Sequence, residues 1–160
     1  MFSRVLLFVL VVLVAPTGVI DWTLSAQMNM GMASEELPES FKEPMKLFEK
    51  GLGPLSRTIT TDVVAAQGFF DQGLQLMYAF TPEDAARSFR EAQKRDPGCA
   101  MCYFGEAWAW GHYLNGPMGP GDLPRAQEAI SMARKFADDG SGVEKALIGA
   151  MEVRYVGRTD

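Results

Sequence analysis

Histidine and cysteine are scarce in this sequence: among 160 residues there are one histidine, His112, and two cysteines, Cys99 and Cys102. A metal site made of several histidines therefore cannot form, and a serine triad has no histidine to spare. Basic residues are also in the minority, with 15 Lys and Arg against 20 Asp and Glu, so nucleic acid has no general electrostatic reason to bind. A hydrophobic fraction of 48% favours one ordered globular domain over a disordered chain.

The apolar run near the N-terminus is shorter than the roughly 20 residues that a membrane-spanning helix needs. Arg4 is followed by an uninterrupted apolar run, Val5–Ala15, and then by the helix breaker Pro16. This pattern is typical of a signal peptide, which we place at residues 1–26. We therefore expect an exported protein, periplasmic or extracellular. The alternative is an uncleaved leader, which would then be the protein's contact with the membrane.

Residues 27–60 are predicted to be a linker with one short helix, because the first part carries few large apolar side chains besides methionine. The helix is expected at Phe41–Lys50, where apolar residues fall near one face. Three methionines alternate in the linker, and thioether sulfur is a ligand for copper(I). Since no histidine or cysteine lies near them, we interpret Met28, Met30 and Met32 as incidental.

Apolar residues at helical intervals begin after Thr61 and predict a helix that ends near Phe80. Thr81 and Pro82 then supply a hydroxyl cap and a proline at the first helical position, so a second helix should begin there. That helix should stop at Pro97. Two helices of this size joined by about two residues pack antiparallel, as a helical hairpin.

The spacing of small and large residues in this hairpin resembles a tetratricopeptide repeat (TPR). In that repeat small residues stand where the paired helices approach most closely, a large residue fills the gap to the next hairpin, and a proline stops the second helix. The matching residues are Gly73, Ala85, Phe89, Ala92 and Pro97.

A second repeat is predicted one TPR period of about 34 residues further on. Its matching residues are Ala107, Ala126, Ile130 and Ala133, and residues 115–121 form an enlarged surface loop. A third hairpin should begin at Ser141, whose hydroxyl pairs with Glu144 in a capping box. Residues 61–160 would then hold about two complete hairpins and one orphan helix. We expect an N-terminal fragment of a longer array, in which Leu147, Ile148, Met151 and Tyr155 lack a covering helix.

The wider stretch Phe69–Met118 is similar to a group of exported bacterial TPR proteins. The similarity lies in the runs FFDQGLQLMYAF, EDAARSFREAQKRDP and CAMCYFGEAWAWG. The resemblance implies an all-α fold in which TPR-like antiparallel hairpins form the start of a right-handed α-solenoid. It also implies binding and scaffolding, without an established reaction.

Cys99 and Cys102 form the one cluster that could carry chemistry, at the start of the second repeat. We interpret them as a local structural disulfide or a pair of buried thiols, since an exported protein meets conditions that favour disulfides. Haem attachment would need a histidine where Tyr103 stands, zinc would need two further ligands, and a thioredoxin-like site would need a strand-helix setting. A periplasmic redox or metal-handling protein that uses this pair is the alternative function.

Other polar residues give catalysis little support. His112, a lone histidine at a helix end, is more typical of capping or packing than of a base. Asp71 and Glu106 are expected to be solvated or rim charges, and Ser88 and Ser131 have no histidine beside them. We therefore expect a non-enzymatic protein without a cofactor.

The inner wall of a TPR superhelix comes from the first helix of each repeat, and here that wall is unusually apolar. The resemblance selects Gln67, Phe70, Leu74, Met77, Met101, Phe104, Trp108 and His112. One interpretation is that the segment Phe41–Phe48, or later repeats, covers this wall. The other is a groove for a protein or peptide partner, with Phe104 and Trp108 as anchors and methionines adapting to its shape. The prediction is an exported interaction module.

Overall fold

The computed structural model describes residues 36–155 and 157. The predicted signal peptide and the three alternating methionines lie outside the described residues. Within that part of the chain, regular structure consists of five α-helices and two short 3-10 helices, without a strand; Tyr113 and Gly116 form one isolated bridge. The predicted all-α fold is confirmed for these residues.

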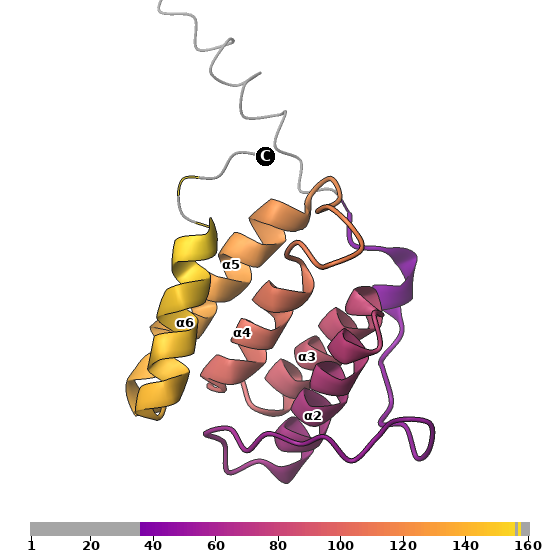
Figure 1. The fold of residues 1–160 in the computed structure, drawn as a ribbon. Coiled ribbons are helices and arrows are strands. Elements are labelled where there is room, and N and C mark those ends of the chain that lie inside the picture. The colour runs from indigo at the N-terminus through magenta and orange to yellow at the C-terminus, as the bar shows by residue number, and fades with distance from the viewer. Residues whose placement is uncertain (1–35, 156, 158–160) are drawn as a thin grey trace, which may run out of the picture. The chain divides into compact units, whose positions relative to one another are not determined.

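The α-helices follow one another in space in the order in which they follow in the chain (Figure 1). They are α2 (Val64–Tyr78), α3 (Pro82–Arg95), α4 (Ala100–Ala109), α5 (Asp122–Lys135) and α6 (Gly142–Tyr155), with the 3-10 helix η3 (Ala137–Asp139) before α6. Each packs mainly against its chain neighbours, and α4 also packs against α2 on one side and α6 on the other. We call the surface that these three helices share the inner face.

The turn between α2 and α3 depends on a left-handed residue, Phe80, whose φ is 61°. The N–H of Phe80 donates to the carbonyl of Met77, and the N–H of Thr81 donates to that of Leu76, so two carbonyls at the end of α2 are satisfied. The predicted hydroxyl cap on α3 is wrong: Thr81 Oγ1 donates to the same Leu76 carbonyl. The hydroxyl is turned back towards α2 because Thr81 completes the end of that helix. Pro82 does occupy the first position of α3.

The predicted capping box at the start of α6 is confirmed. The N–H of Glu144 donates to Ser141 Oγ at 3.3 Å, and the N–H of Ser141 donates to Glu144 Oε2 at 2.7 Å. The exchange satisfies backbone donors that the first turn of a helix leaves without partners. It also orients the Glu144 carboxylate, which has a second role described below.

Phe89 of α3 is the side chain around which the first helix pair meets α4. It is fully buried, and its ring faces a glycine on either side. A Cβ atom added to Gly73 of α2 would lie 2.7 Å from the ring, and one added to Gly105 of α4 would lie 2.4 Å from it. The TPR spacing placed Gly73 where the paired helices approach most closely, and the side chain nearest to a Cβ at this position is the ring of Phe89. The predicted packing residues Ala85, Ala92, Ala107, Ala126 and Ala133 are fully buried, and Pro97 is exposed in the turn after α3.

The predicted helix at Phe41–Lys50 is wrong. Only Glu39–Lys42 is helical, as the 3-10 helix η2, and Glu43 is already extended, with ψ of 135°. Pro44 explains the break, because proline has no N–H to donate and disfavours helical geometry in the residue before it.

The last helix is better covered than the sequence suggested. Ile148 and Tyr155 are buried, and Tyr155 donates its hydroxyl to the carbonyl of Ala107 at 2.7 Å. Leu147 and Met151 are partly buried against the same core. The expectation of a missing covering helix is therefore wrong for Ile148 and Tyr155, since the apolar face of α6 packs back onto α4 and α5.

Candidate functional site

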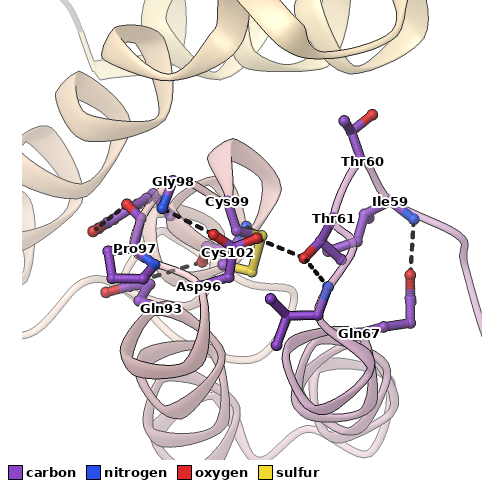
Figure 2. Close-up of a disulfide and its surroundings, with 12 residues drawn as sticks. Ile59, Thr60, Thr61, Gln67, Gln93, Asp96, Pro97, Gly98, Cys99 and Cys102 are labelled. Carbon is purple, nitrogen blue, oxygen red and sulfur yellow. Dashed lines mark hydrogen bonds between the residues drawn. A yellow bond between two sulfur atoms is a disulfide. The ribbon is translucent and has the colours of Figure 1, made fainter.

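Cys99 and Cys102 form a disulfide at the beginning of α4 (Figure 2). Both residues are buried, with exposed fractions of 1% and 0%. Cys99 is the N-cap of the helix, and its Sγ accepts a hydrogen bond from the Cys102 N–H at 3.2 Å. A disulfide that exchanges with partners needs an accessible sulfur. The burial of both residues therefore favours a structural bond over the redox alternative.

Of the other polar residues considered for chemistry, His112 and Ser88 are held in structural contacts. His112 is exposed, and its carbonyl accepts from Arg154 Nη2. Ser88 is buried between α2 and α3, where its hydroxyl donates to the carbonyl of Phe69. Ser131 lies exposed on α5.

Glu106 is not the solvated charge that the sequence suggested. It is buried in α4, where Arg90 Nη1 donates to it at 3.0 Å and Gln93 Nε2 donates to it at 2.6 Å. Trp110 Nε1 donates to the same carboxylate. A buried carboxylate needs such partners, and here they join α3 to α4. Among residues 36–155 and 157, no group of three or more His, Cys, Asp or Glu side chains could hold a metal ion.

The inner face of α2 carries a row of polar side chains that bind an extended segment of the chain itself. Gln67, Asp71 and Gln75 recur four residues apart, so they stand in line on the helix. Gln75 Nε2 donates to the carbonyl of Leu55 at 2.6 Å, and Gln67 Oε1 accepts from the N–H of Ile59 at 3.0 Å. We call residues 55–61 the strap.

The far end of the strap is attached to two other helices. Thr60 donates to Glu144 of α6 twice, from its N–H at 2.7 Å and from its hydroxyl at 2.6 Å. Thr61 Oγ1 donates to Asp96, at the end of α3, at 2.6 Å, beside the disulfide (Figure 2). The strap therefore crosses the inner face from α2 to α6. The sequence interpretation had placed residues 55–60 in a linker and Thr61 at the start of the helical repeats.

The Glu144 carboxylate that accepts the hydrogen bonds from Thr60 of the strap is charged. Burial raises the pKa of this group, but the hydrogen bonds from Thr60 and from Ser141 together outweigh burial and hold its pKa below the usual range. The charged form is thus the one that the folded protein stabilises.

Next to the strap the inner face forms an open groove of about 180 Å³. Its lining comes mainly from α2, α4 and α6, and consists of Arg57, Phe70, Leu74, Tyr78, Phe89, Met101, Phe104, Gly105, Trp108 and Leu147. Tyr78 and Trp108 meet edge to face, with ring centroids 6.1 Å apart. Aromatic pairs prefer this geometry, and tyrosine and tryptophan are enriched at protein interfaces.

The groove gathers most of the residues that the sequence selected for it. Phe70, Leu74, Met101, Phe104 and Trp108 all line it. Three selected residues do not. Met77 is buried in the core, Gln67 binds the strap, and His112 lies beyond the end of α4, which closes at Ala109. The sequence interpretation missed Tyr78, which continues the row of Phe70 and Leu74 at helical spacing and could have been found by it.

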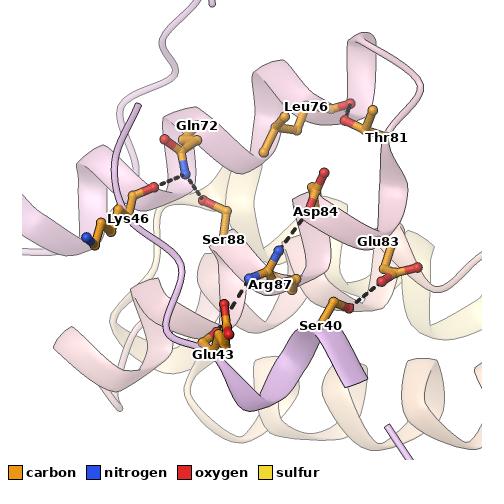
Figure 3. Close-up of polar contacts among 10 residues, drawn as sticks. All are labelled: Ser40, Glu43, Lys46, Gln72, Leu76, Thr81, Glu83, Asp84, Arg87 and Ser88. Atoms are coloured by element: carbon orange, nitrogen blue, oxygen red, sulfur yellow. Dashed lines mark hydrogen bonds and ion pairs between the residues drawn. The ribbon is translucent and has the colours of Figure 1, made fainter. Parts of the chain in front are cut away.

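The segment Phe41–Phe48 does not cover the groove. It packs against α3 and the side of α2, where Arg87 donates to the carbonyl of Glu43 and Gln72 donates to the carbonyl of Lys46 (Figure 3). Ser40 adds a hydrogen bond to Glu83 at the start of α3. The expectation that this segment shields the inner wall is wrong, because its main-chain carbonyls are engaged by side chains on a different surface.

Comparison with known proteins adds no family: no family model, curated protein or solved structure matches this chain. Among the helices of the described residues, none is long and apolar enough to cross a membrane. The case for a function therefore depends on the geometry of the inner face.

Proposed function

We propose that this protein is a non-enzymatic interaction module of the TPR type, which binds an extended peptide of a partner protein in the groove between α2, α4 and α6. Helix pairs of similar length follow one another, and small residues recur at about the spacing of that repeat. In this proposal α2, α4 and α6 are the first helices of successive hairpins, at the start of a right-handed solenoid.

The observation that carries the proposal is the open, apolar groove itself. Its volume of about 180 Å³ is below the roughly 300–1,000 Å³ of pockets that enclose a whole small molecule. A groove of this size suits a few side chains of a longer ligand that continues along the surface. Phe104 and Trp108 supply the large rigid contact area that peptide anchors use.

The strap is an observation in favour of a peptide ligand. It is an extended segment of main chain that is bound on this same face. Gln67 uses both ends of its amide, donating to the carbonyl of Arg57 and accepting from the N–H of Ile59. Asp71 accepts from the N–H of Arg57 at 2.9 Å. Side chains on one helix therefore bind main-chain groups of an extended segment, with no demand on its sequence at those positions.

Export belongs to the same proposal. The apolar run that precedes Pro16 supports it, and a buried disulfide is consistent with an oxidising compartment. Expression with the native leader should yield a periplasmic or secreted product that begins near Gln27. Intact protein that starts at Met1 and stays in the membrane would contradict this part of the proposal.

The test of binding is a random peptide library displayed on phage and selected against the purified protein. Selected peptides should lose at least tenfold in affinity for Trp108→Ala, whose side chain lines the groove. They should keep their affinity for Leu114→Ala, because Leu114 is 88% exposed and lies outside the groove. Equal losses for both variants, or a library without binders, would overturn the proposed function.

A further inference from the structure

Arg57 is fixed by its main chain at the edge of the groove. Its N–H donates to Asp71 Oδ1, and its carbonyl accepts from Gln67 Nε2, both at 2.9 Å. The residue before it is held as well, since Ser56 Oγ donates to Asp71 Oδ2 at 2.7 Å. Three hydrogen bonds to one helix therefore determine where the Arg57 side chain can reach.

The Arg57 side chain lines the groove, and it is the one charged residue among the lining residues. Within the described part of the chain, no carboxylate lies within 4.0 Å of its guanidinium as an ion-pair partner. Asp71 binds the main chain of Arg57, but its two carboxylate oxygens accept hydrogen bonds from Ser56 Oγ, the Arg57 N–H and Gln67 Nε2.

A cation beside an apolar wall selects for an anion more strongly than the same cation in open water. The apolar side chains of the groove exclude water from one side of the exposed Arg57, so the local dielectric constant is lower there and the attraction between unlike charges is screened less. Guanidinium also matches the two oxygens of a carboxylate through parallel hydrogen bonds. The remaining lining residues, including Leu74, Phe104 and Trp108, are uncharged and offer mainly apolar contact to the rest of the ligand.

We propose that the groove is specific for an acidic peptide, in which a large apolar side chain occupies the groove and a neighbouring carboxylate pairs with Arg57. The inference rests on the proposed function and adds the chemistry of the partner. The charge is supplied by the strap and not by the helices, so the strap is part of the recognition surface.

The test uses three synthetic peptides that differ only in charge or in apolar content. The acidic probe is acetyl-Gly-Ser-Asp-Leu-Phe-Asp-Ser-amide; the second replaces both Asp by Asn, and the third keeps both Asp and replaces Leu and Phe by Ser. Each is titrated into the protein while backbone amide and tryptophan indole resonances are followed by NMR. Sedimentation velocity first establishes the oligomeric state. The matched protein variants are Arg57→Gln and Arg134→Gln, since Arg134 is an exposed cation of α5 outside the groove.

The acidic probe should bind the wild-type protein on the order of three- to tenfold more tightly than the Asn peptide, with the difference shrinking as salt is raised. Arg57→Gln should remove that difference and retain the binding of the Asn peptide, whereas Arg134→Gln should preserve the difference. The Ser peptide should not shift the groove resonances.

Three other outcomes would overturn the inference in distinguishable ways. Equal binding of the acidic and Asn peptides in the groove would reject the acidic specificity and leave the proposed function standing. A failure of all three peptides and of the phage-selected peptides to shift the groove resonances would reject both. A dimer that Trp108→Ala dissociates would assign the groove to a second copy of this chain, which also contradicts the inference.

Discussion

The ring of Phe89 on α3 lies so close to Gly105 on α4 that a Cβ atom at position 105 would come within 2.4 Å of two ring carbons. Gly73 on α2 faces the same ring. Because Phe89 is fully buried, its ring has no solvent into which it could retreat. The close approach of α4 to the first helix pair therefore requires a glycine at position 105.

Gly105→Ala should destabilise the protein by about 1 kcal/mol. The added methyl group overlaps the ring at a cost of about 2 kcal/mol, and the gain of about 1 kcal/mol that alanine brings to a helix interior offsets part of that cost. Gly149→Ala in α6 is the matched control, because no atom lies near its added Cβ, and it should stabilise the protein slightly. Urea unfolding of both variants measures the difference. A Gly105→Ala variant as stable as Gly149→Ala would show that the contact with Phe89 is wrongly placed.

At position 80, glycine should give a more stable protein than alanine, which is the reverse of their usual order. Its φ of 61° is costly for any residue with a Cβ, by about 1 kcal/mol or more. Phe80→Gly and Phe80→Ala both lose the half-exposed ring, so the comparison isolates the backbone. The glycine variant should be more stable by about 1 kcal/mol in thermal unfolding. An alanine variant that is equally or more stable would contradict the left-handed turn between α2 and α3.

The disulfide should resist thiol chemistry in the folded protein. Replacing both Cys99 and Cys102 by alanine should lower the free energy of unfolding by about 2 kcal/mol, because a short loop is released in the unfolded chain. When the native protein is treated with dithiothreitol and then alkylated, mass spectrometry should find no modified cysteine, because both sulfurs are buried from an attacking thiol. Two thiols that react rapidly under those conditions would reject a structural disulfide and revive the redox alternative.

Glu144 should make stability depend on pH in the acidic range. Its pKa is lowered in the folded state, since the hydrogen bonds from Thr60 and Ser141 outweigh the effect of burial. The resulting stabilisation is present above the pKa of the unfolded chain and is lost as the pH falls through the lower, folded pKa. Glu144→Gln should therefore cost about 1–3 kcal/mol at pH 7 and progressively less below about pH 4.

The control for this titration is Glu128→Gln, at an exposed position of α5. It should leave both the stability and its pH dependence within about 0.5 kcal/mol of the wild type. Hydrogen exchange at the Thr60 amide should increase in Glu144→Gln and not in the control. A constant gap between Glu144→Gln and wild type from pH 7 to pH 3 would mean that the carboxylate is not charged in the folded state.

The helices could be predicted from the sequence because their signals are local. The period of apolar residues indicated α2, and Ser141 with Glu144 indicated the start of α6. The same reasoning was wrong at Phe41–Lys50, because it followed the spacing of the apolar residues and disregarded Pro44 within the segment. A single proline removes a helical hydrogen bond, and a short segment has too few others to compensate.

The lining residues of the groove could be predicted only where the helical period places them on one face of a helix. Phe70, Leu74 and Tyr78 line the groove at steps of four residues, whereas Met77, on the other side of Leu74 from Tyr78, is buried in the core. The prediction that His112 lines the groove was wrong for another reason. It extended the helical pattern of α4 to residue 112, whereas the helix ends at Ala109.

The strap could not be predicted from its own residues. Its hydrogen bonds join groups as far apart in sequence as Thr60 and Glu144, and hydroxyl-rich segments without apolar period resemble linkers. Its role becomes visible only when the fold brings α2 and α6 to the same face.

Site-specific photo-crosslinking tests the peptide groove most directly. A phage-selected peptide is irradiated with protein that carries p-benzoylphenylalanine at the position of Tyr78 or at the position of Val153, and the adducts are mapped by mass spectrometry. Tyr78 lines the groove, whereas Val153 is 76% exposed on α6 and lies outside it. The peptide should cross-link at position 78 and not at position 153. Cross-links at position 153 with none at position 78 would place the partner elsewhere and contradict a binding groove on the inner face.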